Sequence, residues 1–253
     1  EKRDELIEAV DGVAQSYGEF GVALRPEKRT PVPALPLFDE GVWWAQDAGA
    51  MQAALLLKSL PKGAKVLDMC SAPGGKALQL SSFGFDVVAV EKSANRAKRL
   101  RQNLERCKCD VDVRVQDATL INDMFDGVLV DAPCSATGTA RRRPDVLRKE
   151  LDLEALAATQ AALLDAAWRC LKPGGLLVFS SCSALTADAE QSFAAFLRRT
   201  ADADGVEVAA AELGFVDDES VVDGALRLWP WHVAGDAGGC DAHYAARARK
   251  GPG

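Results

Sequence analysis

The chain lacks the features that mark membrane, secreted and strongly basic proteins. No apolar run reaches the roughly 18 residues of a membrane helix, and no secretory signal opens the sequence. The 7 cysteines are odd in number and show no repeated Cys-x-x-Cys spacing, which argues against a disulfide framework or a zinc site and favours reduced thiols inside a cell. The formal net charge of −7 argues against a globally basic nucleic-acid binder but permits a local basic patch.

Internal repeats and low-complexity tracts are absent too. The 253 residues, 48% of them hydrophobic, are therefore expected to form one large α/β domain, or one such domain with a short extension. The sequence starts at Glu1 rather than Met, which leaves a preceding segment or a targeting peptide open. The sequence therefore does not distinguish between cytoplasm, nucleolus and mitochondrion as the compartment.

The first part of the chain differs in pattern from the rest. Residues 1–12 carry apolar side chains among charges and predict a short amphipathic helix, and the prolines of residues 25–36 predict an extended linker. We therefore predict an N-terminal helix and proline-rich linker over residues 1–37 and a single catalytic domain over residues 38–253.

The larger domain is predicted to begin with a short strand or hairpin over residues 38–44. Asp47 then predicts the N-cap of a helix that extends to about Leu60, where Pro61-Lys62-Gly63 ends it.

From Lys65 onward, strands and helices alternate, which indicates a parallel sheet. The predicted strands cover residues 65–69, 86–90, 111–115, 127–130 and 176–179. The predicted helices cover residues 76–83, 93–107, 151–171 and 187–199. Residues 206–209 and 243–245 are expected to close the sheet as an antiparallel edge. Because crossovers between parallel strands are right-handed, this order predicts an α/β fold with a doubly wound, mostly parallel sheet.

Polar side chains follow several predicted strands at their carboxyl ends, where ligands bind in such sheets. They comprise the loop Cys70-Ser71-Ala72-Pro73-Gly74-Gly75-Lys76, Glu91, Asp117, Asp131 to Cys134, and Cys182. The small-residue loop predicts a cofactor cradle, since glycine lets the backbone approach a ligand closely. The alternative is an ordinary strand-to-helix turn.

Two acids are candidates for cofactor contacts. Glu91 ends the second predicted strand, where an acid typically binds a ribose hydroxyl pair; a solvated loop charge is the alternative. Asp117 follows the third strand and could accept a hydrogen bond from an adenine amino group or act as a helix N-cap.

Two thiols are candidates for catalysis. Cys134 and Cys182 are expected at the ends of neighbouring strands, where Lys76 or arginines could acidify a thiol into a nucleophile. Asp131 would then be an acceptor or proton donor in the same pocket. The alternative for either cysteine is a small core residue.

The densest positive charge lies in a loop with Arg141, Arg142 and Arg143, which could contact phosphates or be a solvated loop. The basic helix over residues 93–107 is interpreted as a solvated face. Cys107 and Cys109 are interpreted as structural. The two histidines, His232 and His243, are far from the strand ends in sequence and receive no chemical role.

Two strand ends together resemble a known family. Asp131-Ala132-Pro133-Cys134-Ser135-Ala136-Thr137-Gly138, combined with Ser180-Ser181-Cys182-Ser183, is similar to the RNA cytosine-5 methyltransferases of the NOL1/NOP2/Sun group, which includes the bacterial Sun-like ribosomal RNA enzymes. Phe38–Gly41 with Gln46-Asp47 resembles that family's entry motif, and Cys70–Lys76 resembles its cofactor loop. The similarity extends from about Phe38 to about Phe196.

The resemblance implies a Rossmann-like S-adenosylmethionine-dependent methyltransferase fold. It implies that Cys182 is the nucleophile and that Cys134 resolves the covalent intermediate and releases the RNA. Lys76 and Asp131 would also approach the target base. The implied cofactor contacts are Cys70 to Lys76, Glu91, Asp117 and Asp131.

Several departures from the family pattern are visible. Ser181 stands where threonine is usual, and Asp188-Ala189-Glu190 lacks the usual asparagine. Gly239-Cys240-Asp241-Ala242-His243-Tyr244 replaces an Asp-Gly-Phe-Phe strand. No RNA-binding domain precedes Phe38, so RNA affinity is expected from residues outside this sequence, a partner protein or a ribosomal particle.

We therefore expect an RNA cytosine-5 methyltransferase that uses S-adenosylmethionine, with ribosomal RNA as first substrate and transfer RNA as second, and no membrane partner. One alternative is a catalytically idle ribosome-assembly or RNA-binding factor with the same fold. Another is a DNA cytosine methyltransferase, which would use the Pro-Cys thiol as nucleophile, and the second thiol at Cys182 discriminates against it.

Overall fold

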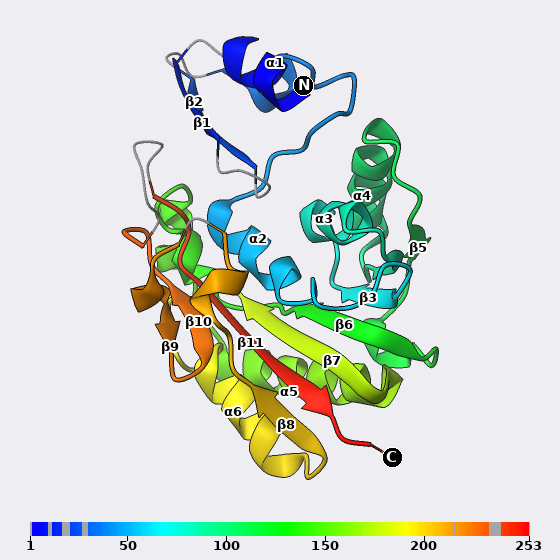
Figure 1. Ribbon diagram of the computed structural model, residues 1–253. Coiled ribbons are helices and arrows are strands. Elements are labelled where there is room, and N and C mark those ends of the chain that lie inside the picture. Colours follow the sequence, from blue (N-terminus) through cyan, green and yellow to red (C-terminus); the bar gives the residue numbers. More distant parts are fainter. Residues whose placement is uncertain are drawn as a thin grey trace.

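The computed structural model describes residues 2–9, 12–16, 21–26, 30–214, 216–232 and 239–252. Its centre is a sheet with the strand order β5-β4-β3-β6-β7-β11-β10-β9, and β8 pairs with β11 off that path (Figure 1). The strands of this sheet are β3 (Lys65–Met69), β4 (Asp86–Val90), β5 (Asp112–Arg114), β6 (Phe125–Asp131), β7 (Leu171–Ser181), β8 (Ala203–Val206), β9 (Val221–Val222), β10 (Ala225–Leu228) and β11 (His243–Lys250). The helices packed on it are α2 (Ala48–Leu55), α3 (Gly75–Ser82), α4 (Ala94–Arg106), α5 (Leu153–Cys170) and α6 (Glu190–Arg199).

The parallel half of the sheet consists of β3 to β7, which pair in parallel. All five predicted strands are confirmed, and β3 and β4 have the predicted bounds. The four predicted helices are confirmed, and their ends differ from the predicted ones by at most three residues.

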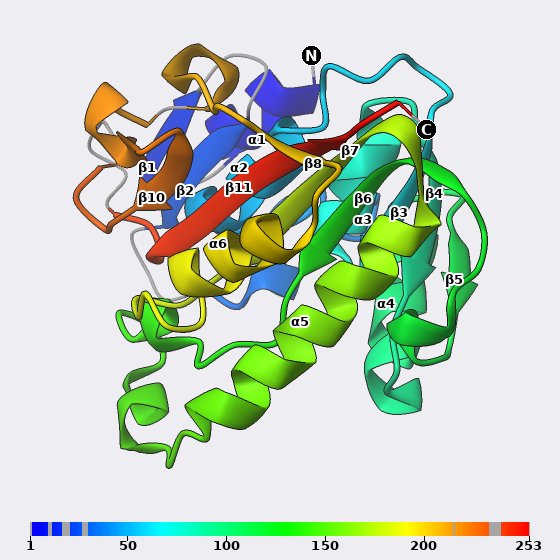
Figure 2. The same ribbon diagram turned by 90° about the horizontal axis from the view of Figure 1, so that it is seen from below.

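Helices cover both faces of this half, as a doubly wound sheet requires. In Figure 1, α5 and α6 lie below the sheet and α2 and α3 lie above it, and Figure 2 views the molecule from the side of α5 and α6. Successive strand side chains point to opposite faces. Leu67 therefore packs in the core with Leu163 of α5, whereas Val66 packs in the core with Leu78 of α3.

The antiparallel part is larger than the predicted edge. β11 contains the predicted residues 243–245 and pairs antiparallel with β7, but β10 lies on its other side and β8 pairs along its second half. The predicted strand over residues 206–209 is wrong in its bounds, because β8 overlaps it only at Val206. Residues 243–248 are buried, so β11 is an interior strand whose backbone groups need partners on both sides. The sequence pattern did not predict β10 or β9.

The N-terminal part contains the predicted helix, α1 (Lys2–Ala9), and an unpredicted hairpin of β1 (Gly12–Ser16) and β2 (Val22–Pro26). The predicted linker contains a short 3-10 helix, η2 (Val32–Ala34), and residues 27–29 lie outside the described residues. The division at residue 37 stays a prediction.

The prediction of a strand or hairpin over residues 38–44 is wrong, because these residues form turns. The side chain of Arg106, on α4, holds them in place. Its Nη1 donates to the Phe38 carbonyl at 2.6 Å and its Nη2 donates to the Trp43 carbonyl at 3.0 Å. The guanidinium lies 3.9 Å from the centre of the Phe38 ring. The basic helix therefore has at least one structural arginine and is not only a solvated face.

The N-cap prediction for α2 is confirmed, because Asp47 Oδ1 accepts from the Gly49 N–H at 2.9 Å. The predicted end at Leu60 is wrong. The helix ends at Leu55, and tighter turns follow, in which Leu57 and Lys58 donate to carbonyls three residues earlier. None of the helices in the described part of the chain is long and apolar enough to cross a bilayer.

The remaining short 3-10 helices lie in the loops. They are η3 (Ala118–Leu120), η4 (Thr137–Thr139), η5 (Pro144–Arg148), η6 (Ala210–Glu212) and η7 (Asp218–Ser220).

Candidate active site

The predicted cofactor loop connects β3 to α3 through a left-handed turn. Gly74 is the N-cap of α3 and has a φ of 108°. A Cβ at this position would lie 2.6 Å from Cδ1 of Leu100 on α4. Glycine is thus required for the turn and for the packing of the loop against α4.

An acid near the carboxyl end of β3 supports this loop. The hydroxyl of Ser71 donates to Asp68 Oδ2 at 2.6 Å. Asp68 is fully buried, and burial raises the pKa of its carboxyl to about 7. The Ser71 bond opposes this rise, and the neighbouring Asp131 and Glu91 carboxylates add to it.

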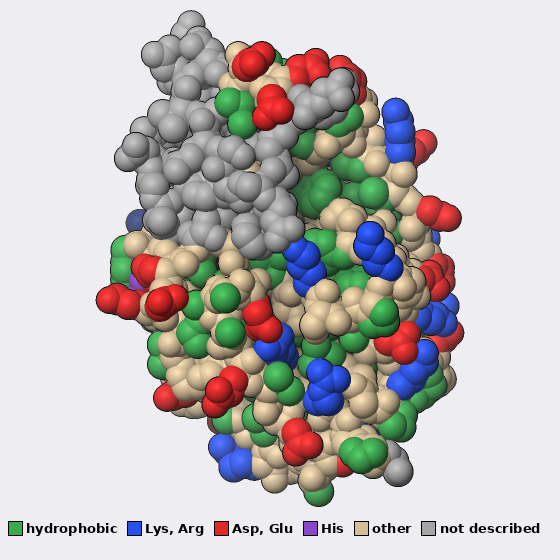
Figure 3. Space-filling view, viewed as in Figure 1, with side chains coloured by type: hydrophobic (Ala, Val, Ile, Leu, Met, Phe, Trp, Pro, Cys, Tyr) green, Lys and Arg blue, Asp and Glu red, His purple; other side chains and the backbone are tan. Residues whose placement is uncertain are grey.

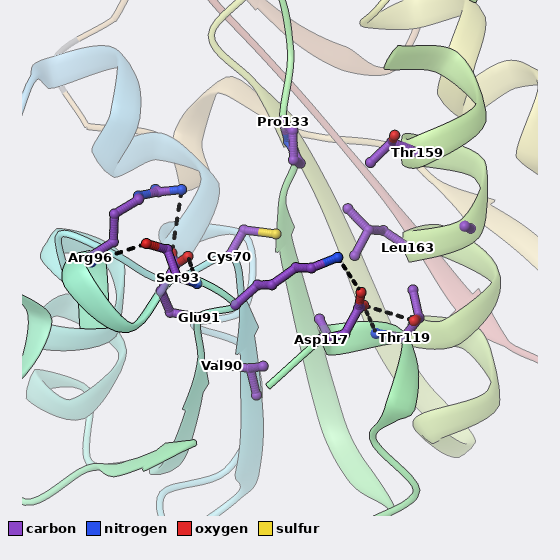
Figure 4. Close-up of a pocket in the computed structure, with 13 residues that line it drawn as sticks. Cys70, Val90, Glu91, Ser93, Arg96, Asp117, Thr119, Pro133, Thr159 and Leu163 are labelled. Carbon is purple, nitrogen blue, oxygen red and sulfur yellow. Dashed lines mark hydrogen bonds and ion pairs between the residues drawn. The ribbon is translucent and has the colours of Figure 1, made fainter. Parts of the chain in front are cut away.

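A cavity of about 600 Å³ lies where β3, β4 and β5 end (Figure 4). It has polar and apolar walls. The lining residues are Cys70, Val90, Glu91, Lys92, Ser93, Arg96, Asp117, Ala118, Thr119, Pro133, Thr159, Ala162 and Leu163. Of the predicted cofactor residues, Cys70, Glu91 and Asp117 line it, whereas Asp131 and the rest of the loop after Cys70 do not.

Glu91 is held rigidly in the cavity wall. Its Oε1 accepts from the Ser93 N–H at 2.9 Å. Its Oε2 is buried, has no hydrogen-bond donor among the described residues, and lies 3.4 Å from Nη1 of Arg96. Nη2 of Arg96 donates to the Ala72 carbonyl, so the arginine is fixed from two sides. This buried oxygen is suited to a donor that arrives with a ligand, such as a ribose hydroxyl.

Asp117 acts as a helix N-cap, which is one of the two alternatives that the sequence left open, and its contact with an adenine amino group stays a prediction. Its Oδ1 caps the short helix η3 by accepting from the Thr119 N–H at 3.0 Å, and its Oδ2 accepts from Lys92 Nζ at 2.8 Å. Hydrogen bonds from Lys92, then from Thr119, lower the pKa of Asp117 to about 2. The carboxylate is therefore charged at the cavity wall at neutral pH.

Lys76 and Asp131 form an ion pair beside the cavity. The Lys76 Nζ lies 2.9 Å from Asp131 Oδ2, and the lysine is buried while Asp131 is 34% exposed. Burial opposes the charge of Lys76, but the Asp131 carboxylate more than offsets this and raises the lysine pKa. Asp131 thus presents a fixed carboxylate on an accessible edge.

The two candidate thiols meet, as predicted, at the ends of neighbouring strands. The Sγ atoms of Cys134 and Cys182 lie 3.5 Å apart, and β6 and β7 pair directly through Asp131 and Ser180. A hydrogen bond from the Cys182 thiol lowers the pKa of Cys134 to about 7. The same bond and burial raise the pKa of Cys182, and the Lys76 charge opposes that rise. The pair therefore holds a single negative charge before it holds two.

Polar groups from α5 and the β7–α6 loop fix both cysteine loops. Gln160 Nε2 donates to the carbonyls of Pro133 and Asp188, at 2.9 and 3.1 Å. The Asp188 carboxylate accepts from the Ser135 N–H, and the backbone carbonyl of Asp188 accepts from the Ser181 hydroxyl. Sequence reasoning assigned no role to Gln160, because a glutamine in the middle of an amphipathic helix has no distinguishing pattern.

Comparison with known proteins places this geometry in a family. The family model described as 16S rRNA methyltransferase RsmB/F matches residues 54–246. The chain belongs to this family. Ribosomal RNA small subunit methyltransferase B of Xanthomonas campestris is 44% identical over 192 residues, which cover 72% of this chain and 44% of that protein. The chain thus spans about half the length of the curated relatives it matches.

Solved structures agree on the fold. The crystal structure of PH0851 covers 98% of this chain and 56% of that one, with 25% identity and a TM-score of 0.83. A methyltransferase homologue from Pyrococcus horikoshii covers 94% of this chain and 78% of that one, with 25% identity and a TM-score of 0.75. The Rossmann-like methyltransferase fold is therefore confirmed. The RsmB/F match includes both thiols, Lys76, Glu91, Asp117 and Asp131.

The predicted RNA-contacting arginines of this RsmB/F chain are engaged with acids. Nε of Arg142 donates to Asp241 Oδ2 at 2.6 Å, and Arg141 lies 3.3 Å from Asp47 and 3.5 Å from Asp241. Arg143 pairs with the exposed Asp145 at 3.1 Å. Two of the three arginines thus tie this loop to the start of α2 and the segment before β11. Phosphate contact stays a prediction for all three.

The departure from the usual Asp-Gly-Phe-Phe strand does not disturb the sheet, since His243 begins β11 and Tyr244 pairs with Ser181 of β7. His243 is buried beside the site, with Nε2 2.7 Å from the hydroxyl of Ser180. His243 is thus far from the strand ends in sequence but close to them in the fold. The register of an antiparallel pair between distant segments is not visible in either strand alone.

Proposed function

We propose that this chain contains the catalytic part of an S-adenosylmethionine-dependent RNA cytosine-5 methyltransferase that acts on ribosomal RNA. The observation that carries the proposal is the thiol pair, Cys134 and Cys182, at 3.5 Å beside the Lys76–Asp131 ion pair. A core role for both cysteines would not place them in polar loops next to a charged pair. The substrate class follows from the relatives, which are ribosomal RNA small subunit methyltransferases.

The cavity fits S-adenosylmethionine. Glu91 offers a buried oxygen without a hydrogen-bond donor among the described residues, in position for ribose hydroxyls. Asp117 offers a charged acceptor for an adenine amino group, and Leu163 and Pro133 supply apolar surface for the flat base. When bound, the cofactor supplies an electrophilic methyl group.

The chain's own residues prepare the cytosine. The thiolate of Cys182 forms a bond to carbon 6 of the base, and the electron pair of the 5,6 double bond then makes carbon 5 nucleophilic. Cys134 has the lower pKa of the two thiols and lies 3.5 Å from Cys182, so its thiolate can accept the Cys182 proton as attack begins. Lys76 stabilises the thiolate that forms on Cys182.

Release requires the proton on carbon 5 to leave and the bond between sulfur and carbon 6 to break. Cys134, in the loop after β6, lies 3.5 Å from the Cys182 sulfur, which fits the resolving role that the resemblance implies. The target cytosine must be unpaired or flipped to reach this depth. Because the chain spans about half of its relatives' length, further RNA affinity is expected from additional sequence, a partner protein or the ribosomal particle.

The test uses the chain with small-subunit ribosomal RNA transcribed in vitro and S-adenosylmethionine carrying a labelled methyl group. Cys182→Ala is expected to abolish labelling of cytosine, and Cys134→Ala is expected to accumulate an RNA–protein adduct on denaturing gels. Full methylation by Cys182→Ala would overturn the proposal. The intact thiols and cavity disfavour the idle-factor alternative, which predicts cofactor binding without transfer.

A further inference from the structure

His243 is connected to the candidate base-binding carboxylate through one serine. Its Nε2 lies 2.7 Å from the Ser180 hydroxyl, and that hydroxyl lies 3.3 Å from Asp131 Oδ1. The other carboxylate oxygen, Oδ2, is 2.9 Å from Lys76 Nζ. Four side chains from β11, β7, β6 and α3 thus form one continuous chain of polar contacts.

The direction of these hydrogen bonds follows from the number of protons. Asp131 pairs with Lys76 as a carboxylate, so it only accepts, and Ser180 must use its single proton to donate to it. The Ser180 oxygen is then an acceptor for His243, which must carry its proton on Nε2. His243 Nδ1 is buried and has no hydrogen-bond partner in the described residues, as expected for the bare nitrogen of this tautomer.

The surroundings keep the ring neutral. Burial, reinforced by the charges of Lys76 and Arg227, lowers the pKa of His243 to about 3, and the Asp131 carboxylate opposes this only in part. The other ionisable groups around Asp131 are Asp68, Cys70, Cys134 and Cys182. A neutral imidazole with a fixed tautomer donates one directed hydrogen bond and does not change its protonation state near neutral pH.

We propose that His243 is a positioning residue for the target base: its Nε2–H directs the Ser180 hydroxyl toward Asp131, so the carboxylate keeps one orientation between Ser180 and Lys76. This inference rests on the proposed function, in which Asp131 meets the base. The Asp131 carboxylate is partly accessible, whereas Ser180 and His243 are buried. Ser180 and His243 therefore affect the base only through Asp131. Without His243 the Ser180 oxygen loses the donor that fixes the orientation of its hydroxyl toward Asp131 Oδ1.

The first test concerns the hydrogen bond itself. Nitrogen-15 NMR of the full chain between pH 5 and pH 8, with His243 assigned by the loss of its signals in His243→Phe, should show a neutral ring protonated on Nε2 throughout. Ser180→Ala should shift the Nε2–H proton resonance. A ring that titrates in this range, or that carries its proton on Nδ1, would overturn the inference.

The second test measures the rate of covalent adduct formation with small-subunit ribosomal RNA that contains 5-fluorocytidine, in the presence of S-adenosylmethionine. Fluorine replaces the carbon 5 proton that must leave before the base is released, so the adduct persists. His243→Phe and Ser180→Ala should each slow the adduct about tenfold, with RNA affinity unchanged, because a misoriented group lowers the rate of reaction rather than binding. His243→Gln, whose amide N–H can replace Nε2–H, should keep the rate within about threefold of wild type.

The double variant Ser180→Ala/His243→Phe decides whether His243 acts through Ser180. It should be no slower than Ser180→Ala alone, and independent losses that multiply would overturn the inference. His232→Phe is the matched control, since His232 is also buried but its Nδ1 faces the Trp229 N–H. An unfolding temperature close to that of wild type shows that each variant is folded. A wild-type chain that forms no adduct overturns the proposed function itself, whereas a wild-type rate in His243→Phe overturns this inference alone.

Discussion

The Sγ atoms of Cys134 and Cys182 lie 3.5 Å apart although 48 positions separate them in the sequence. The parallel pairing of β6 and β7 brings Asp131 opposite Ser180 and thereby aligns the two loops that follow. Ser183, beyond Cys182, and Ser135, beyond Cys134, are linked through their hydroxyls at 2.8 Å. The distance between the thiols is therefore a property of the sheet and its loops, and the sharing of one proton follows from it.

The acidity of Cys134 is predicted to depend on Cys182. In the wild-type chain, alkylation of Cys134 by iodoacetamide should reach half its maximal rate near pH 7, because the Cys182 thiol stabilises the thiolate. In Cys182→Ala that hydrogen bond is lost, and the midpoint should move upward by about one pH unit or more, toward an ordinary thiol. Mass spectrometry of the labelled peptide gives the rate. An unchanged midpoint would show that the thiols do not share a proton.

Glu91 is predicted to govern cofactor affinity. Glu91→Gln removes the charge that accepts ribose hydroxyls, and S-adenosylmethionine should bind about 10- to 100-fold more weakly, as expected for the loss of a hydrogen bond to a charged group. Isothermal titration calorimetry measures this. Asp86→Asn, at the exposed other end of β4, is the matched control and should bind like wild type. Equal affinity in both variants would contradict the role of Glu91.

Asp68 is predicted to make stability depend on pH. Its pKa in the folded chain is raised to about 7, above the value of 3.8 in an unfolded chain, so the folded state binds the proton more tightly. The resulting stabilisation is complete below about pH 4 and is lost as pH rises toward 7. Asp68→Asn keeps an acceptor for Ser71 but cannot ionise. Relative to wild type, the free energy of unfolding of this variant should therefore rise between pH 5 and pH 7, by on the order of 1 kcal/mol per pH unit at most.

Chemical denaturation at several pH values measures that difference, with Asp86→Asn as an exposed control. A difference that is constant across this range would show that Asp68 ionises normally in the folded chain.

Substitution of Arg142 is predicted to lower stability much more than substitution of Arg143, although the two residues are neighbours. Arg142→Ala would leave Asp241 buried with its best donor removed, and should lower the free energy of unfolding by about 1–3 kcal/mol. Arg143 pairs with an exposed aspartate, so Arg143→Ala should change stability by less than about 0.5 kcal/mol. Urea denaturation separates the two variants.

If Arg143 contacts phosphate, filter binding of ribosomal RNA should weaken in Arg143→Ala and the salt dependence of binding should become shallower. Equal RNA affinity in Arg143→Ala and wild type would show that Arg143 is not part of the RNA interface.

Local sequence patterns predicted the parallel half of the fold and the cavity residues Cys70, Glu91 and Asp117. The strands β3 and β4 were predicted with their bounds, because short apolar runs between loop residues and capped helices are local patterns. The positions of Glu91 and Asp117 at the cavity follow from the rule that strand ends meet at one edge of a parallel sheet. Ser93, Asp47 and Asp152 act as N-caps for the same local reason.

The antiparallel half and the polar support of the site depend on long-range packing, which is visible only in the folded chain. β11 lies between β7 and β10 because distant segments bury one another's apolar faces, and no local pattern fixes that register. For the same reason the sequence left His243 without a role, although the fold places it 2.7 Å from Ser180. Likewise Gln160 and Arg106 hold loops that are remote in the chain. Local chemistry specifies which groups are present at strand ends, whereas long-range pairing of strands determines which of them touch.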